Sequence, residues 1–170
     1  NNSELVGILG NFINRVVVLT NKYYDGFVPA QNNLEDYDKE VLSFLEVCGN
    51  TVGDCIENYK MRDALSEVMN IARLGNKYLA DTEPWKLKKT DEKRTETILN
   101  IALQISANLC VYLEPFLPFA AKQLSEMLNV NFSAWDQNKT LEKDHKINGP
   151  SLLFAKIEDD KMEEKLNKLK

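Results

Sequence analysis

The chain has 170 residues, 44% of them hydrophobic, and a formal net charge of -5 at pH 7. This length and apolar fraction predict one folded domain and exclude a disordered chain. The negative charge argues against a domain that coats DNA or RNA through phosphate contacts alone, because such domains are usually basic. With no run of about 18 apolar residues and no signal-peptide pattern, we expect a soluble, cytoplasmic protein without a membrane partner.

Apolar residues recur every three or four positions from the start of the chain, which is the spacing of a helix with one buried face. The first predicted helix covers residues 3–24 and the second covers residues 36–58. Gly49 and Gly53 weaken the interior of the second helix, so we expect a kink or a close helix contact there.

A broad apolar face predicts a third helix over residues 60–80. It is followed by a loop, because Pro84 disfavours helical backbone at the residue before it. The same spacing predicts helices over residues 91–114 and 119–128.

Four long helices and one shorter helix, joined by short connections, predict an all-α antiparallel helical bundle. We expect a single domain over residues 1–170, with its core in residues 1–130 and an irregular connection over residues 131–157. Residues 158–170 are predicted to form a short, highly charged C-terminal helix. The chain starts with Asn1 and reaches helical spacing at once, so we expect it to be part of a longer polypeptide.

The sequence contains no pattern typical of a catalytic or metal site. Its one histidine, His145, lies in a polar stretch and is predicted to be an exposed loop residue. Cys48, Cys55 and Cys110 lack the two-residue spacing of metal and redox motifs and are interpreted as reduced core thiols. The glycines form no phosphate-binding loop. We therefore assign no catalytic residue and no metal ligand.

Charge is distributed unevenly along the chain. Residues 35–57 contain seven acids and one base, whereas residues 60–94 contain nine bases and six acids. This predicts one positive side on a negative molecule, with a solvated surface of mixed charge as the alternative.

Trp85 follows Pro84 beside three lysines, Lys86, Lys88 and Lys89. Burial in the core is one interpretation of this tryptophan. Exposure beside bases is the other, and it would make the indole a platform on which a nucleobase stacks.

Asn11 and Arg15 are four residues apart and so share a face of the first predicted helix. One interpretation gives Asn11 a helix-capping or intrahelical role and Arg15 a surface role. An amide and a planar guanidinium can also read the Watson-Crick edge of an unpaired base together.

Five short motifs, in this order, resemble the C-terminal helical domain of bacterial methionyl-tRNA synthetases, and the resemblance covers nearly the whole chain. The motifs are Gly10-Asn11-Phe12-Ile13-Asn14-Arg15, Tyr24-Asp25-Gly26-Phe27-Val28-Pro29, Asn76-Lys77-Tyr78-Leu79, Glu83-Pro84-Trp85-Lys86 and Leu113-Glu114-Pro115-Phe116-Leu117-Pro118. No single motif is diagnostic, and the ordered set carries the resemblance.

The resemblance implies an anticodon-binding bundle whose partner is the anticodon stem-loop of tRNA(Met). It implies that Asn11, Arg15 and Trp85 contact the first anticodon base, a cytosine, and that Pro84 shapes the tryptophan loop. Nearby lysines are expected to contact tRNA phosphates without reading sequence: Lys77, Lys86, Lys88 and Lys89.

The two class I signature motifs of the family, His-Ile-Gly-His and Lys-Met-Ser-Lys-Ser, are absent from this sequence. The resemblance therefore implies that a catalytic domain lies upstream, where ATP and, as a further candidate, zinc would bind. The fragment itself is expected to hold no cofactor and not to aminoacylate tRNA.

Two alternatives remain open on the sequence alone. One is the similar bundle of another class I synthetase. The other is a helical protein-interaction module, in which the Trp85 loop and the acidic second helix bind a partner protein.

Overall fold

The computed structural model describes residues 2–132, 135 and 140–156, and all regular structure in these ranges is helical. The elements are the π-helix η1 (Asn2–Gly10) and the α-helices α1 (Asn11–Tyr24), α2 (Asp36–Glu57), α3 (Met61–Thr82), α4 (Pro84–Leu87), α5 (Glu92–Tyr112) and α6 (Pro118–Leu128). An isolated antiparallel bridge joins Phe27 to Lys146. The predicted all-α fold class is confirmed, whereas the helix predicted at residues 158–170 lies outside the described residues.

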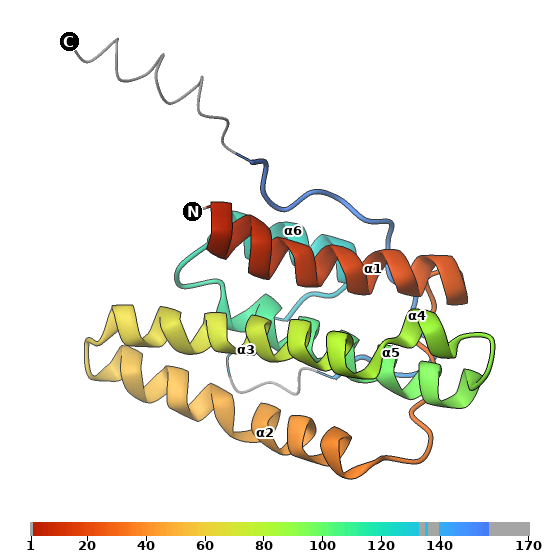
Figure 1. Ribbon diagram of the computed structural model, residues 1–170. Coiled ribbons are helices and arrows are strands. Elements are labelled where there is room, and N and C mark those ends of the chain that lie inside the picture. The colour runs from red at the N-terminus through yellow and green to blue at the C-terminus, as the bar shows by residue number, and fades with distance from the viewer. Residues whose placement is uncertain (1, 133–134, 136–139, 157–170) are drawn as a thin grey trace.

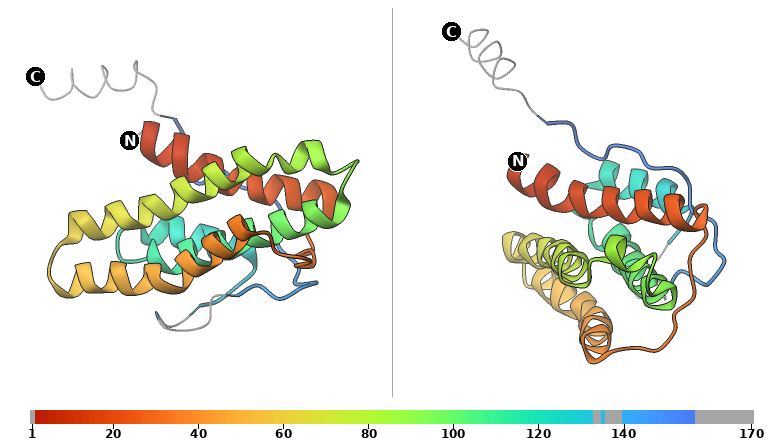
Figure 2. Two further views of the ribbon diagram at one scale, coloured as in Figure 1. Left: turned by 60° about the horizontal axis from the view of Figure 1, so that its bottom comes forward. Right: turned by 45° about the vertical axis from the view of Figure 1, so that its right-hand side comes forward.

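The central element of the bundle is α5, which has sixteen buried residues among its 21. Every residue over 97–107 is buried, so this part of the helix is surrounded by other elements on all sides. Figure 1 shows α2 and α3 as an antiparallel pair, with η1 and α1 on the opposite side of α3. Figure 2 shows from two further directions that α2 and α3 remain side by side.

The predicted helix ends are close to the observed ones, with two differences. The first helix changes from wide π turns to α-helical turns at Asn11. α3 continues to Thr82, after which Glu83 adopts left-handed backbone angles, with φ 42° and ψ 56°. Pro84 then begins α4, because its fixed φ suits the first helical position. Trp85, which we predicted in a loop, therefore lies in a four-residue helix.

Buried amides on α5 bind two connecting segments to the bundle. The Asn100 Nδ2 donates to the Pro29 carbonyl oxygen at 2.8 Å. The Gln104 Nε2 donates to the carbonyl oxygen of Leu141, and the Leu141 N–H donates to Gln104 Oε1, both at 2.9 Å. These bonds satisfy polar side chains inside an apolar core, where an unpaired amide would be costly.

The predicted environment of His145 is wrong. Its ring is half-buried, and Nε2 lies 2.8 Å from the carbonyl oxygen of Leu128 at the end of α6. The polar sequence around His145 suggested an exposed loop, but the segment over 140–156 returns along the bundle and bonds to it. The division into a core and an irregular connection stays a prediction.

Two glycines allow helices to approach closely. A Cβ at Gly49 would lie 2.2 Å from the Tyr112 hydroxyl, which confirms the close contact expected in α2. A Cβ at Gly75 of α3 would lie 2.4 Å from Cζ of Phe12, a fully buried ring of α1. The contact at Gly75 sets the distance between α3 and α1.

We expect Gly75→Ala to lower the free energy of unfolding by about 1–2 kcal/mol, because overpacking a tight core outweighs the gain in helix propensity. Gly53→Ala is the matched control, since its Cβ would meet Trp135 Nε1 at an ordinary 3.6 Å. That control should be neutral or slightly stabilising. Urea unfolding of both variants measures the difference, and equal stabilities would contradict the close packing of Phe12 on Gly75.

The helical stretch Ser3–Tyr24 is long and apolar enough, by length and composition alone, to cross a membrane. In the bundle some of its apolar residues pack in the core. Five of them are completely buried: Leu9, Phe12, Ile13, Val16 and Val17. The core of the bundle thus uses part of the apolar surface of this stretch.

The three cysteines are free thiols, as predicted. Cys48 and Cys110 are buried, whereas Cys55 is only partly covered. Burial raises the pKa of Cys110 to about 12, so its thiol stays protonated and unreactive.

Candidate nucleic-acid interface

Arg15 and Trp85 come together where α4 meets α1. The guanidinium carbon of Arg15 lies 4.8 Å from the centroid of the Trp85 ring. The turn at Glu83 and the buried ring of Pro84 place the indole there. Trp85 keeps 37% of its surface exposed, so it is neither a core residue nor a freely projecting one. Part of its aromatic surface remains accessible.

The guanidinium of Arg15 forms no ion pair or hydrogen bond with any residue that the structure describes. Its side chain is half-buried and held by the cation–π contact. Five N–H donors in a fixed plane are therefore available to a ligand.

Asn11 is exposed on the same helix, one turn before Arg15. Its Nδ2 donates to Oδ1 of Asn76 on α3 at 3.2 Å. Asn76 in turn donates from Nδ2 to the carbonyl oxygen of Ile8 at 2.8 Å and to that of Ala72 at 3.2 Å. Asn76 belongs to one of the five motifs, but the sequence gives no sign of its place in the site, because its bond to Asn11 spans 65 residues.

Asn11, Arg15 and Asn76 line one groove between the first helix and α3. The groove has a volume of about 430 Å³. Its other lining residues are Gly7, Ile8, Arg73, Lys77 and Ala80. The Arg73 guanidinium donates to the Glu4 carboxylate at 2.6 Å, and this ion pair connects α3 to η1. The groove thus brings the Arg15 guanidinium and the amide of Asn11 together beside a shallow apolar floor.

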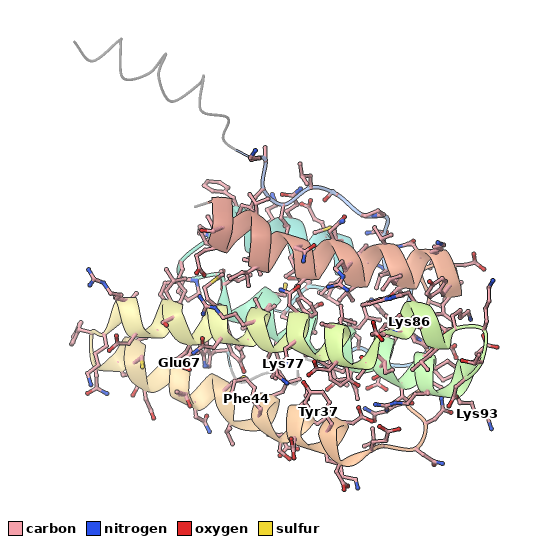
Figure 3. The ribbon with its side chains drawn as sticks, viewed as in Figure 1. Tyr37, Phe44, Glu67, Lys77, Lys86 and Lys93 are labelled. Carbon is pink, nitrogen blue, oxygen red and sulfur yellow. The ribbon has the colours of Figure 1, made fainter. Side chains whose placement is uncertain are left out.

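Three of the four lysines predicted to contact phosphates have acidic partners. Lys77 pairs with Asp81 at 2.6 Å, and this hydrogen bond raises the pKa of the lysine. Figure 3 shows Lys77 and Tyr37 between α3 and α2, and the lysine Nζ lies 5.3 Å from the centre of the tyrosine ring.

Lys86 and Lys88 pair with acids in the same region. Lys86 lies 2.8 Å from Glu83, and Lys88 contacts Glu92. Lys89 is exposed, with no acidic partner among the described residues. The phosphate contacts stay a prediction. To bind a phosphate, Lys77, Lys86 and Lys88 would first have to leave a carboxylate, whereas Lys89 would not.

A buried ionic cluster that local sequence patterns did not indicate joins α2, α3 and α5. Asp38 has no exposed surface and accepts hydrogen bonds from Arg94 and from the Tyr78 hydroxyl, the latter at 2.6 Å. Burial alone would raise the pKa of Asp38, but hydrogen bonds from Arg94 and Tyr78 outweigh it and hold that pKa below its usual range. The cluster fixes the end of α3 from which α4 and Trp85 emerge.

A second cavity of about 600 Å³ lies between α2, α5 and residues 140–143. Its polar lining comes from amides such as Asn100, Gln104 and Asn108. Within the described ranges, no group of three or more His, Cys, Asp or Glu side chains could hold a metal ion.

The fold is that of the helical part of a tRNA synthetase. Apo Mycobacterium tuberculosis methionyl-tRNA synthetase matches this chain with a TM-score of 0.86 at 21% identity, over 92% of this chain and 33% of that one. The same enzyme in complex with methionyl-adenylate matches with a TM-score of 0.83 at 23% identity, over 91% of this chain and 32% of that one. At these identities the likeness establishes the architecture alone.

Sequence comparison defines the family. A family model described as the anticodon binding domain of methionyl tRNA ligase matches residues 28–170. The methionine–tRNA ligase of Phocaeicola vulgatus is 52% identical over 172 residues, which cover 99% of this chain and 25% of that protein. The chain belongs to the family of anticodon-binding domains of methionyl-tRNA ligases and spans about a quarter of the length of such relatives. The predicted resemblance is confirmed, in preference to another class I synthetase.

Proposed function

We propose that this chain reads the first anticodon base of tRNA(Met), a cytosine, as one part of a class I methionine–tRNA ligase. The observation that carries the proposal is the half-buried Arg15, which has no acidic partner among the described residues and lies against the partly exposed Trp85. A cation that is partly withdrawn from water usually has an acidic partner, so an unpaired one beside an aromatic surface favours a ligand with acceptor groups.

The free groups of the site complement the Watson-Crick edge of cytosine. Cytosine presents an amino donor beside two acceptors, N3 and O2. Arg15 supplies donors for the two acceptors, and Asn11 supplies an acceptor for the amino group. Uracil would present a carbonyl oxygen and an N–H at the corresponding positions. Leaving these groups unpaired costs about 1–3 kcal/mol.

Trp85 supplies the stacking surface for this base. Arg15 covers part of the indole, and the base stacks on the surface that the guanidinium leaves exposed. One base stacked on an aromatic side chain contributes about 1–3 kcal/mol. Stacking holds the base, while hydrogen bonds at its edge distinguish it from other bases.

Phosphates of the tRNA would be held by lysine side chains in and around the groove. Lys89 can bind a phosphate directly, whereas Lys77, Lys86 and Lys88 would exchange a carboxylate for it. Such contacts add affinity without sequence preference and weaken as salt concentration rises.

The whole protein is proposed to attach methionine to tRNA(Met) in the cytoplasm, using a catalytic domain upstream of this chain. The bound methionyl-adenylate in the Mycobacterium tuberculosis enzyme supports ATP as the substrate of that domain. We assign zinc, as a further candidate cofactor, to the catalytic domain as well. This chain contributes recognition of the anticodon and no step of the chemistry.

The test is the selectivity of the full-length protein for the first anticodon base. Arg15→Ala is expected to lower the preference for cytosine over uracil in tRNA(Met) transcripts by about tenfold, because one to two edge hydrogen bonds are lost. Arg62→Ala is the matched control, since Arg62 is exposed at the start of α3. Aminoacylation efficiency with both transcripts gives the ratio, and unchanged selectivity of the Arg15 variant would remove it from the site.

A further inference from the structure

Asn76 joins the two helices that border the groove through both ends of its amide. Its Nδ2 is directed at two backbone acceptors, the carbonyl oxygens of Ile8 and Ala72. Its Oδ1 accepts a hydrogen bond from Nδ2 of Asn11 at 3.2 Å. Asn76 is half-buried, whereas Asn11 is exposed to the groove.

These bonds determine which end of each amide faces which way. A carbonyl oxygen only accepts, so the NH₂ group of Asn76 must face Ile8 and Ala72. The Oδ1 of Asn76 then faces Asn11, so Asn11 must donate a hydrogen bond from its own NH₂ group. If the Asn76 amide were reversed, its Oδ1 would face the carbonyl oxygen of Ile8. Two acceptors would then oppose each other, and that hydrogen bond would be lost.

The Oδ1 of Asn11 is left with no hydrogen-bond partner among the residues that the structure describes. We propose that Asn76 is a positioning residue that fixes Asn11 with this acceptor available to the RNA. Asn11 then accepts from the amino group of cytosine and opposes the carbonyl oxygen of uracil. This inference rests on the proposed function. It makes Asn76 a determinant of specificity, although Asn76 itself does not need to contact the base.

Without Asn76, the amide of Asn11 could turn over and offer its NH₂ group instead. That NH₂ group would donate a hydrogen bond to the carbonyl oxygen of uracil. Loss of Asn76 should therefore reduce discrimination more than it reduces affinity. A residue that only stabilises the fold would weaken binding of both RNAs equally.

The experiment compares Asn76→Ala with the matched control Asn108→Ala in the full-length protein. Asn108 is also a half-buried helical asparagine, but its side chain bonds within α5, to Gln104 O at 2.9 Å. Dissociation constants are measured for tRNA(Met) transcripts with cytosine or uracil as the first anticodon base. We expect the cytosine-to-uracil preference to fall at least fivefold in Asn76→Ala, and to be unchanged in Asn108→Ala.

A second measurement needs no RNA and keeps the inference testable if the variant is unstable. In protein labelled with ¹⁵N at asparagine, the side-chain amide protons of Asn11 should exchange with solvent more slowly than those of a free asparagine. This protection should disappear in Asn76→Ala. Unprotected Asn11 protons in the wild-type protein would overturn the inference.

The outcomes separate the two claims. An unchanged preference in Asn76→Ala, together with a reduced one in Arg15→Ala, would overturn the role of Asn76 and leave the proposed function standing. A wild-type protein that binds both transcripts equally would overturn the proposed function.

Discussion

Replacing Asp38 with alanine is expected to lower the free energy of unfolding by about 3 kcal/mol, the lower end of the range for removing one partner of a buried ion pair. Arg94 keeps only 12% of its side chain exposed, and Asp38 keeps none. The substitution leaves the guanidinium with Glu35 alone, at 3.2 Å, and the hydroxyl of Tyr78 without its acceptor. The remaining Glu35 contact is the reason for choosing the lower end of the range.

The full effect should be present at pH 7. Hydrogen bonds from Arg94 and Tyr78 overcome the effect of burial and lower the pKa of Asp38 in the folded protein. A group with a lowered folded pKa stabilises the fold above its unfolded pKa, about 3.9 for aspartate, and loses this contribution as the pH falls through the folded pKa. The carboxylate is therefore ionised at pH 7 in both states, and its partners are present only in the folded one.

Urea unfolding at pH 7, followed by circular dichroism, measures this change. Asp54→Ala is the matched control, because Asp54 is an exposed aspartate on the same helix. It should unfold at nearly the wild-type urea concentration, since isolated surface charges contribute little. A loss below about 1 kcal/mol in Asp38→Ala would mean that the ionic cluster does not hold α2, α3 and α5 together.

Local patterns were sufficient to predict the longer helices, but not α4. The second predicted helix, over residues 36–58, differs from α2 by one residue, because its apolar stripe and its turn residues coincide. Pro84 marked the end of the third helix, since it disfavours helical backbone in the residue before it. The pattern could not indicate that the same proline begins α4, because a four-residue helix is too short to show a period.

The candidate site was predicted only in part. Arg15 and Trp85 do approach each other, as the resemblance implied. The roles of Asn76 and Asp38 depend on partners that are distant in sequence, such as Arg94, which is 56 residues from Asp38. Neither residue interrupts the local helical pattern, so periodicity and spacing carry no signal for these contacts.

Trp85→Ala is expected to lower the aminoacylation efficiency of the full-length protein at least tenfold. On the proposed function, the variant loses the stacking of one base, worth about 1–3 kcal/mol. It also loses the cation–π contact that holds Arg15, worth about 0.5–1 kcal/mol at a partly exposed site. Trp85→Phe keeps an aromatic ring at the same place and should lose less.

Phe119→Ala is the control for removal of an exposed aromatic ring, because Phe119 is 89% exposed on α6 and outside the groove. It should leave the efficiency unchanged. Thermal unfolding of the Trp85 variant distinguishes a lost stacking surface from a lost fold, since a partly exposed indole also packs on its neighbours. In a folded Trp85→Ala protein, a loss well under tenfold would count against the stacking role. A loss that equals that of the double variant with Arg15→Ala would instead indicate that Arg15 acts only while the indole supports it.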